Sequence, residues 1–214
     1  MKNDVVPLTP AELRARARNA EPGSPEWILY SAAAFDAMVE CPLILVGGGA
    51  QVVHTQQHRP TDIDMVGRIT QRDFEALAAA GYEKQGRHWI YAWKRVDGVD
   101  VEVPAAVLMG EDPPEIVDVG GHHLRVISLH DLMMDRLVQA TDRTDVTWDE
   151  VMELAEATFD RVNWDTVRAR CMVKRKEDIG LHILPQVLDE VLAELDTMHE
   201  RGRDNPGASM DAGF

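Results

Sequence analysis

The sequence predicts an α/β fold in which helices flank a mixed sheet and a helical bundle follows at the C-terminus. An apolar run from Leu43 to Val46 stops at three consecutive glycines, as expected of a buried strand that turns into a helix. Two later segments, 61–66 and 99–103, alternate polar and apolar residues with the period of a strand. Apolar residues then recur at helical spacing from Trp148 onward.

The composition is that of a folded globular protein. The chain has 214 residues, of which 45% are hydrophobic and 28% charged, so it can bury a core. A net charge of -15 argues against a wide nucleic-acid-binding surface but leaves room for a local basic patch. Cys41 and Cys171 have no partners at zinc or disulfide-framework spacing. Without a run of about 18 apolar residues or a signal-peptide pattern, the sequence predicts a cytoplasmic protein with no membrane partner.

Turn and cap residues delimit the elements of the first half. Ser24 and Pro25 open the second of two N-terminal helices, and Gly81 ends an alanine-rich one. Asp97-Gly98 marks a hairpin turn, Pro104 ends the strand that follows, and Ser128 caps the next helix. In order, we expect helices over 10–18, 25–39, 50–57, 71–80 and 129–141, strands over 42–46, 61–66, 88–94, 99–103 and 122–127, and a loop over 111–121.

Three regions are expected along the chain. Residues 1–127 form the α/β domain with its N-terminal helices, and residues 128–201 form a helical region. After the first helix of this helical region, further helices are expected over 148–161, 164–174 and 184–200. Residues 202–214 are rich in glycine, aspartate and small side chains, which predicts a disordered tail.

The glycines after the first strand are candidates for phosphate binding. Gly47, Gly48 and Gly49 would let the backbone approach phosphate oxygens at the positive end of the following helix. A glycine triplet by itself is a weak signal, because a tight turn explains it equally well. It has neither the Gly-Lys-Ser/Thr of a Walker loop nor the G-x-G-x-x-G of a dinucleotide site.

Acidic residues on two strands are candidates for metal binding. Asp62 and Asp64 share one face of their strand, and Asp100 and Glu102 share one face of a later strand. Carboxylate oxygens are suitable ligands for Mg²⁺ or Mn²⁺. Either Asp100 or Glu102 could complete the set, and Asp100 is favoured because it lies first in its strand. The alternative is that these acids are the solvated face of an edge strand.

These motifs resemble those of the nucleotidyltransferase superfamily, particularly its minimal and abortive-infection-type toxin members. The resemblance lies in the Gly-Gly signature at Val46–Ala50, the Asp-x-Asp segment at His58–Asp64 and the third-acid strand at Val99–Val101. It covers residues 42–103. It extends to about residue 157 through the helix around Ser128–Leu132 and Asp135–Leu137, where such relatives carry a Lys or Arg.

The resemblance implies a nucleotidyltransferase-like fold and assigns roles to named residues. A nucleoside triphosphate would contact the glycines together with Arg59 and Thr61. The metal ions would be held by Asp62, Asp64 and either Asp100 or Glu102.

The activity implied is metal-dependent transfer of a nucleoside monophosphate from a nucleoside triphosphate to an acceptor. The acceptor is an RNA such as tRNA, a protein or a small molecule, and the chain would be the toxin of a toxin–antitoxin pair with an antitoxin protein as partner. Lys174, Arg175 and Lys176, preceded by Arg168 and Arg170, are either an RNA docking patch or a solvated helix end. The alternative function is a catalytically inactive module of the same fold that binds a nucleotide or a partner.

Overall fold

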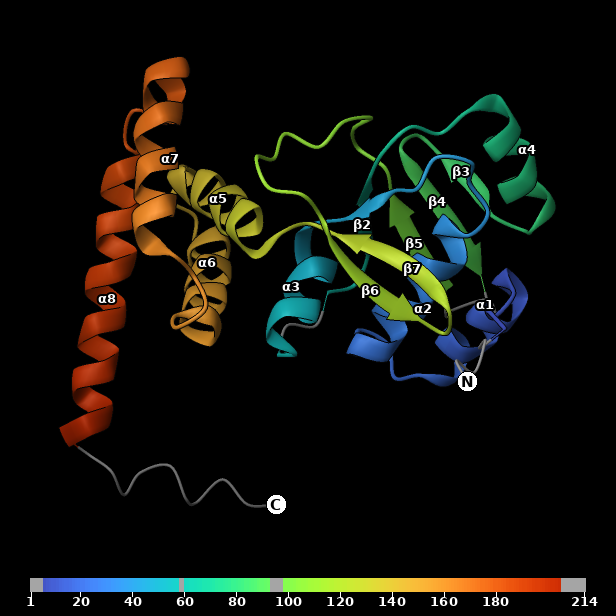
Figure 1. The fold of residues 1–214 in the computed structure, drawn as a ribbon, viewed down its shortest axis with the longest axis horizontal. Coiled ribbons are helices and arrows are strands. Elements are labelled where there is room, and N and C mark those ends of the chain that lie inside the picture. The colour runs from blue at the N-terminus through green and yellow to red at the C-terminus, as the bar shows by residue number, and fades with distance from the viewer. Residues whose placement is uncertain (1–5, 58–59, 93–97, 205–214) are drawn as a thin grey trace, which may run out of the picture. The chain divides into compact units, whose positions relative to one another are not determined.

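The computed structural model describes residues 6–57, 60–92 and 98–204, which divide into two compact units between Leu132 and Met133 (Figure 1). The first unit holds a seven-stranded mixed sheet in the order β3-β4-β5-β2-β1-β7-β6. β1 is parallel to β7 and β2 is parallel to β5, while the other neighbours are antiparallel. The strands are β1 Ile44–Leu45, β2 Ile63–Val66, β3 Glu83–Gln85, β4 His88–Ala92, β5 Gly98–Glu102, β6 Glu115–Val119 and β7 His122–Val126.

Side-chain caps open the first two helices of this unit, and the cap at Ser24 is the one that the sequence predicts. Thr9 forms a capping box with Glu12, and the Ser24 hydroxyl accepts a hydrogen bond from the amide of Trp27. α2 packs against the sheet through β7, β2 and β5, and α1 packs against α2 (Figure 1). The helices are α1 Pro10–Asn19, α2 Pro25–Asp36, α3 Gly47–Thr55 and α4 Gln71–Ala79. The mixed α/β class predicted from the sequence is therefore confirmed.

The second unit is helical. The boundary between the units falls within α5, Leu129–Gln139, which begins at a Ser128 cap in the first unit. The helices α6 Asp145–Thr158, α7 Trp164–Glu177 and α8 Leu184–Asp204 follow. α8 packs against both α6 and α7 through buried aliphatic side chains such as Val187, Leu188 and Leu195. α8 runs three residues into the predicted tail, and residues 205–214 of that tail lie outside the described chain.

Two strands were not predicted from the sequence. β6 lies within 111–121, where a loop was expected, because Gly120 and Gly121 both adopt positive φ and close a tight hairpin with β7. β3 forms because Gly86, with φ of 64°, turns the chain so that Gln85 pairs with His88. The predicted turn at Asp97-Gly98 lies partly outside the described residues.

A helix that crosses a membrane must be both long and apolar. Among the residues that the structure describes, no helix has the length and apolarity needed to cross a bilayer.

Asp73 ties the start of α4 to the chain that leads into β1. One carboxylate oxygen accepts hydrogen bonds from the amide and hydroxyl of Thr70, and the other accepts from the amide of Glu40, all at 2.8 Å. Burial opposes ionisation of this 1% exposed residue, but these hydrogen bonds outweigh burial and lower its pKa. The ionised carboxylate therefore stabilises the folded state.

We predict that Asp73→Asn lowers the free energy of unfolding at pH 7 by about 1–2 kcal/mol, since one acceptor becomes a donor. Because the folded pKa is lowered, this contribution is complete above about pH 4 and is lost as the pH falls further. Urea unfolding at pH 7 and pH 3 measures the change, with the exposed Glu75→Gln on the same helix as control. Equal stability of the two variants at pH 7 would contradict the prediction.

Candidate metal centre

The glycine turn after β1 is built around Asp64. The amide of Val46 donates a hydrogen bond to the carbonyl oxygen of Asp64 at 2.9 Å, continuing the pairing of β1 with β2. Gly47 has a φ of 57°, and a Cβ at this position would overlap the Asp64 carboxylate. Glycine is therefore required at position 47 both for its conformation and for the close approach to the acid.

The three glycines form the first turn of α3, whereas the sequence predicted a helix that begins only at Ala50, after a glycine turn. Val46 is the N-cap residue and provides no side-chain cap. Gly49 is buried, and a Cβ there would lie 2.9 Å from Cδ1 of Leu45 and 3.4 Å from Cγ2 of Ile28. Gly49 thus permits close packing of α3, while Gly47 and Gly48 are half-buried.

Three carboxylates converge beside this turn. The parallel register of β2 and β5 places Glu102 directly beside Asp64, and Asp62 lies one residue before β2. One carboxylate oxygen from each of Asp62, Asp64 and Glu102 lies within 4.8 Å of the other two. Asp62 and Asp64 are half-buried, and Glu102 is 9% exposed. We call these three residues the acidic triad.

Glu102, and not the favoured Asp100, joins the aspartate pair. Asp100 lies two residues earlier on β5, opposite Ile90 of β4, and its Oδ1 is 3.2 Å from Nδ1 of His88. The choice depends on the register between β2 and β5, which neither strand's own sequence contains. The structure thus brings Glu102, and not Asp100, close to the aspartate pair, and we propose Glu102 as the third ligand.

The triad has basic neighbours that the sequence did not single out. Nε of Arg87 lies 2.5 Å from Oε1 of Glu102, and Nε2 of His88 lies 3.9 Å from Oε2 of the same carboxylate. The register between β4 and β5 pairs His88, the first residue of β4, with Glu102, and Arg87 directly precedes His88. The sequence signal was the Arg-His pair before an aromatic strand, but using it required knowledge of the hairpin register.

The acidic triad fits a hard divalent cation. All three donors are carboxylate oxygens, which Mg²⁺ and Mn²⁺ prefer. With metal–oxygen bonds of about 2.1 Å, an octahedral ion separates its ligands by about 3.0–4.2 Å. Small side-chain rotations would bring the triad, whose oxygens lie within 4.8 Å, to this spacing.

The remaining residues proposed from the sequence lie in different places. Thr61 is exposed directly before Asp62, whereas Arg59 lies outside the described residues. Arg136, at the position where the resemblance places a basic residue, is buried, and its Nη1 is 2.9 Å from Oε2 of Glu150 within the helical unit. This ion pair between α5 and α6 compensates the buried charge of Arg136.

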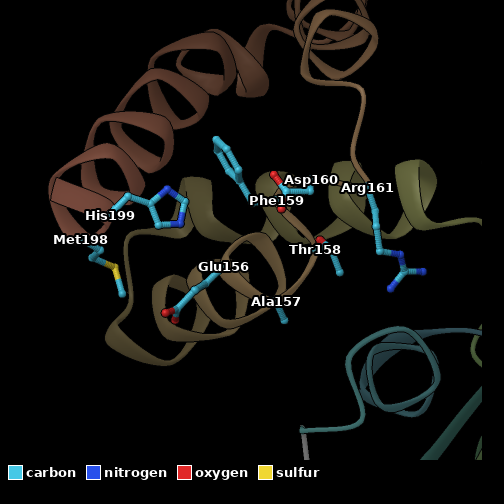
Figure 2. Close-up of a pocket in the computed structure, with 8 residues that line it drawn as sticks. All are labelled: Glu156, Ala157, Thr158, Phe159, Asp160, Arg161, Met198 and His199. Atoms are coloured by element: carbon cyan, nitrogen blue, oxygen red, sulfur yellow. The ribbon is translucent and has the colours of Figure 1, made fainter. Parts of the chain in front are cut away.

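A separate cavity of about 860 Å³ lies in the helical unit (Figure 2). His199 and Met198 reach it from α8, and the other lining residues come from the end of α6 and the turn after it. The rings of Phe159 and His199 meet edge to face with centroids 4.9 Å apart. The cavity lining contains none of the triad residues.

No protein-family model and no curated protein matches the chain. Among solved structures it is similar to an antigenic nucleotidyltransferase-like protein from Paracoccidioides brasiliensis, with a TM-score of 0.48 and 15% identity over 86% of this chain and 95% of that one. It is also similar to the antibiotic-resistance factor ANT(2'')-Ia, with a TM-score of 0.42 and 14% identity over 83% of this chain and 96% of that one. What the site does is inferred from its own residues.

We predict that Asp62→Asn, Asp64→Asn and Glu102→Gln each weaken Mn²⁺ binding by at least about tenfold, because each removes a charged ligand. Asp100→Asn should weaken it less than any of the three, and the exposed Glu115→Gln should leave it unchanged. Electron paramagnetic resonance titration of free Mn²⁺ measures the affinities. A loss with Asp100→Asn equal to that with Glu102→Gln would contradict the assignment of Glu102.

Proposed function

We propose that this chain is a metal-dependent nucleotidyltransferase, which moves a nucleoside monophosphate from a nucleoside triphosphate to an acceptor. The observation that carries the proposal is the contact between the glycine turn of α3 and the acidic triad. Gly47 packs directly on Asp64, so a group bound at the turn would lie next to the triad. A phosphate-binding element adjacent to a divalent-cation site is the arrangement that phosphoryl chemistry needs.

The glycine turn would bind the triphosphate. The first amides of a helix have no acceptor within the helix, and the N-cap residue of α3 supplies no side-chain acceptor. Amides in this position favour an anion together with the helix dipole. Gly47 and Gly48 are the residues that the geometry favours for this contact, because Gly49 is buried in the core.

Asp62, Asp64 and Glu102 would hold the metal. A divalent cation bound there would neutralise charge on the triphosphate and favour deprotonation of the attacking hydroxyl. In the transfer, the acceptor oxygen forms a bond to the α-phosphorus, the bond to the pyrophosphate oxygen breaks, and the acceptor proton goes to solvent. The site residues orient these groups and require no covalent intermediate on the protein.

A second candidate is a module that binds a nucleotide or a partner without catalysis. The ion pair between Arg87 and Glu102 favours it, because the third acid of the triad already has a cationic partner. In this case the cation site would be weakened and the glycine turn would be the functional part. Binding of a nucleotide without release of pyrophosphate distinguishes this function from the transferase.

For the acceptor we propose RNA such as tRNA, with a protein or a small molecule as the other classes. Lys174, Arg175 and Lys176 lie in the last turn of α7, and the side chains of Arg175 and Lys176 are exposed. Arg168 on the same helix is paired with Asp189 at 2.5 Å. The narrower form of the proposal is a toxin whose transfer reaction arrests growth and whose antitoxin protein restrains it.

The transferase proposal predicts magnesium-dependent transfer of label from an α-³²P-labelled nucleoside triphosphate to a component of cell extract, with release of pyrophosphate. Asp64→Asn and Glu102→Gln should each reduce transfer by at least about a hundredfold, since both remove transition-state charge stabilisation. Glu115→Gln should retain activity. Absence of transfer in the presence of measured nucleotide binding would support the non-catalytic module instead.

The RNA proposal predicts that replacing Lys174, Arg175 and Lys176 together by Gln weakens binding of tRNA and reduces the salt dependence of that binding. Each phosphate contact that is lost means that fewer counterions are released on binding. The magnitude of the slope of log K against log salt should therefore fall by about one per contact. Fluorescence anisotropy at several salt concentrations measures it. An unchanged slope would place the RNA elsewhere or favour another acceptor.

A further inference from the structure

A small basic cavity shares Arg87 with the acidic triad and lies where β2 and β5 end. Gly67 and Ile69 come from the segment after β2, and residues 103–106 from the segment after β5. The β3–β4 hairpin supplies Lys84, Arg87 and Trp89. Its volume of about 180 Å³ corresponds to roughly six water molecules and is below the ~300 Å³ of sites for drug-sized ligands. It therefore suits a compact group rather than a whole nucleoside.

The charge of this cavity is opposite to that of the chain. Its lining contains two cations, Lys84 and Arg87, and no acidic residue, in a protein of net charge -15. Nζ of Lys84 lies 5.1 Å from the ring centroid of Trp89, which holds the ammonium over an apolar wall. Such a lining favours a small anion.

Arg87 belongs both to this cavity and to the acidic triad. Its guanidinium is paired with Glu102, although 65% of the side chain is exposed. A divalent cation bound to the triad would compete with Arg87 for the Glu102 carboxylate. Release from Glu102 would leave the guanidinium charge without its partner at the wall of the cavity, where an anion would then be favoured.

We propose that Lys84 and Arg87 form a phosphate-binding subsite, and that Arg87 couples this subsite to the metal centre by leaving Glu102 when a divalent cation binds there. The metal half of this inference rests on the proposed function, whereas the subsite itself depends only on the charges at the cavity. Metal and phosphate would then strengthen each other's binding, since coupling between two sites is reciprocal. In a transferase, the subsite would take a phosphate group of a substrate or product.

The first test uses inorganic phosphate and metal-free protein. Glu102→Gln removes the partner of Arg87 while keeping the shape of the side chain, so phosphate should bind at least about fivefold more tightly than to the wild type. Adding Arg87→Gln to Glu102→Gln should abolish the gain, and adding Lys84→Gln should reduce it. Isothermal titration calorimetry in chelator-treated buffer measures the affinities, and thermal unfolding verifies that each variant is folded.

A matched control pair joins α4 to the segment between α2 and β1. Arg72 and Glu40 form an exposed ion pair with Nη1 and Oε1 2.6 Å apart, and neither residue lines the basic cavity. Glu40→Gln makes the same change of charge and also frees an arginine. It should leave phosphate binding unchanged. A gain equal to that of Glu102→Gln would show a general charge effect and overturn the subsite.

The second test measures the coupling through the metal. Arg87→Gln should bind Mn²⁺ several-fold more tightly than the wild type, because the metal no longer competes with a cation for Glu102, and Arg72→Gln should not. Unchanged Mn²⁺ affinity in Arg87→Gln overturns the coupling. If Glu102→Gln gains phosphate affinity but the wild type transfers no nucleotide, the subsite stands and the transferase proposal fails. If the wild type transfers nucleotide but Glu102→Gln gains no phosphate affinity, the transferase proposal stands and the subsite fails.

Discussion

The parallel pairing of β2 with β5 is the interaction on which the candidate site depends. It sets Glu102 beside Asp64, while the antiparallel pairing of β1 with β2 brings the glycine turn of α3 onto the same aspartate. A shift of one residue in the β2–β5 register would turn Glu102 to the other face of the sheet, away from the two aspartates. Buried side chains on the apolar face, among them Ile63 and Val101, favour this register. A shift by one residue would expose them to water and bury the acids in their place, which costs free energy.

The candidate site holds both acidic and basic side chains. Three carboxylates within coordination range repel one another, and Arg87 on Glu102 offsets part of that repulsion. The same ion pair connects the triad with the basic cavity, so a change of charge at one alters the other. This coupling gives Arg87 a role in both proposals: as the competitor of a metal and as a ligand of an anion.

The two units carry different candidate functional features. The sheet unit carries the triad, the glycine turn and the basic cavity, all on segments positioned by strand register. The helical unit carries the exposed basic turn of α7 and a larger cavity in which Phe159 and His199 meet. Buried Arg136 is paired there with Glu150, which compensates its charge.

Local patterns in the sequence determined much of this protein. The α/β class, the helices and most strands were predicted from features that depend on neighbours a few residues apart. These features are the caps at Ser24 and Ser128, the apolar run at Leu43–Val46, and the alternation around Asp62–Asp64 and Asp100–Glu102. Tertiary structure alone decided that Glu102 rather than Asp100 meets the aspartate pair, that Gly49 packs into the core and that Arg87 reaches the triad. These outcomes follow from the register between strands distant in sequence, and that register is set by which side chains bury together in the folded chain.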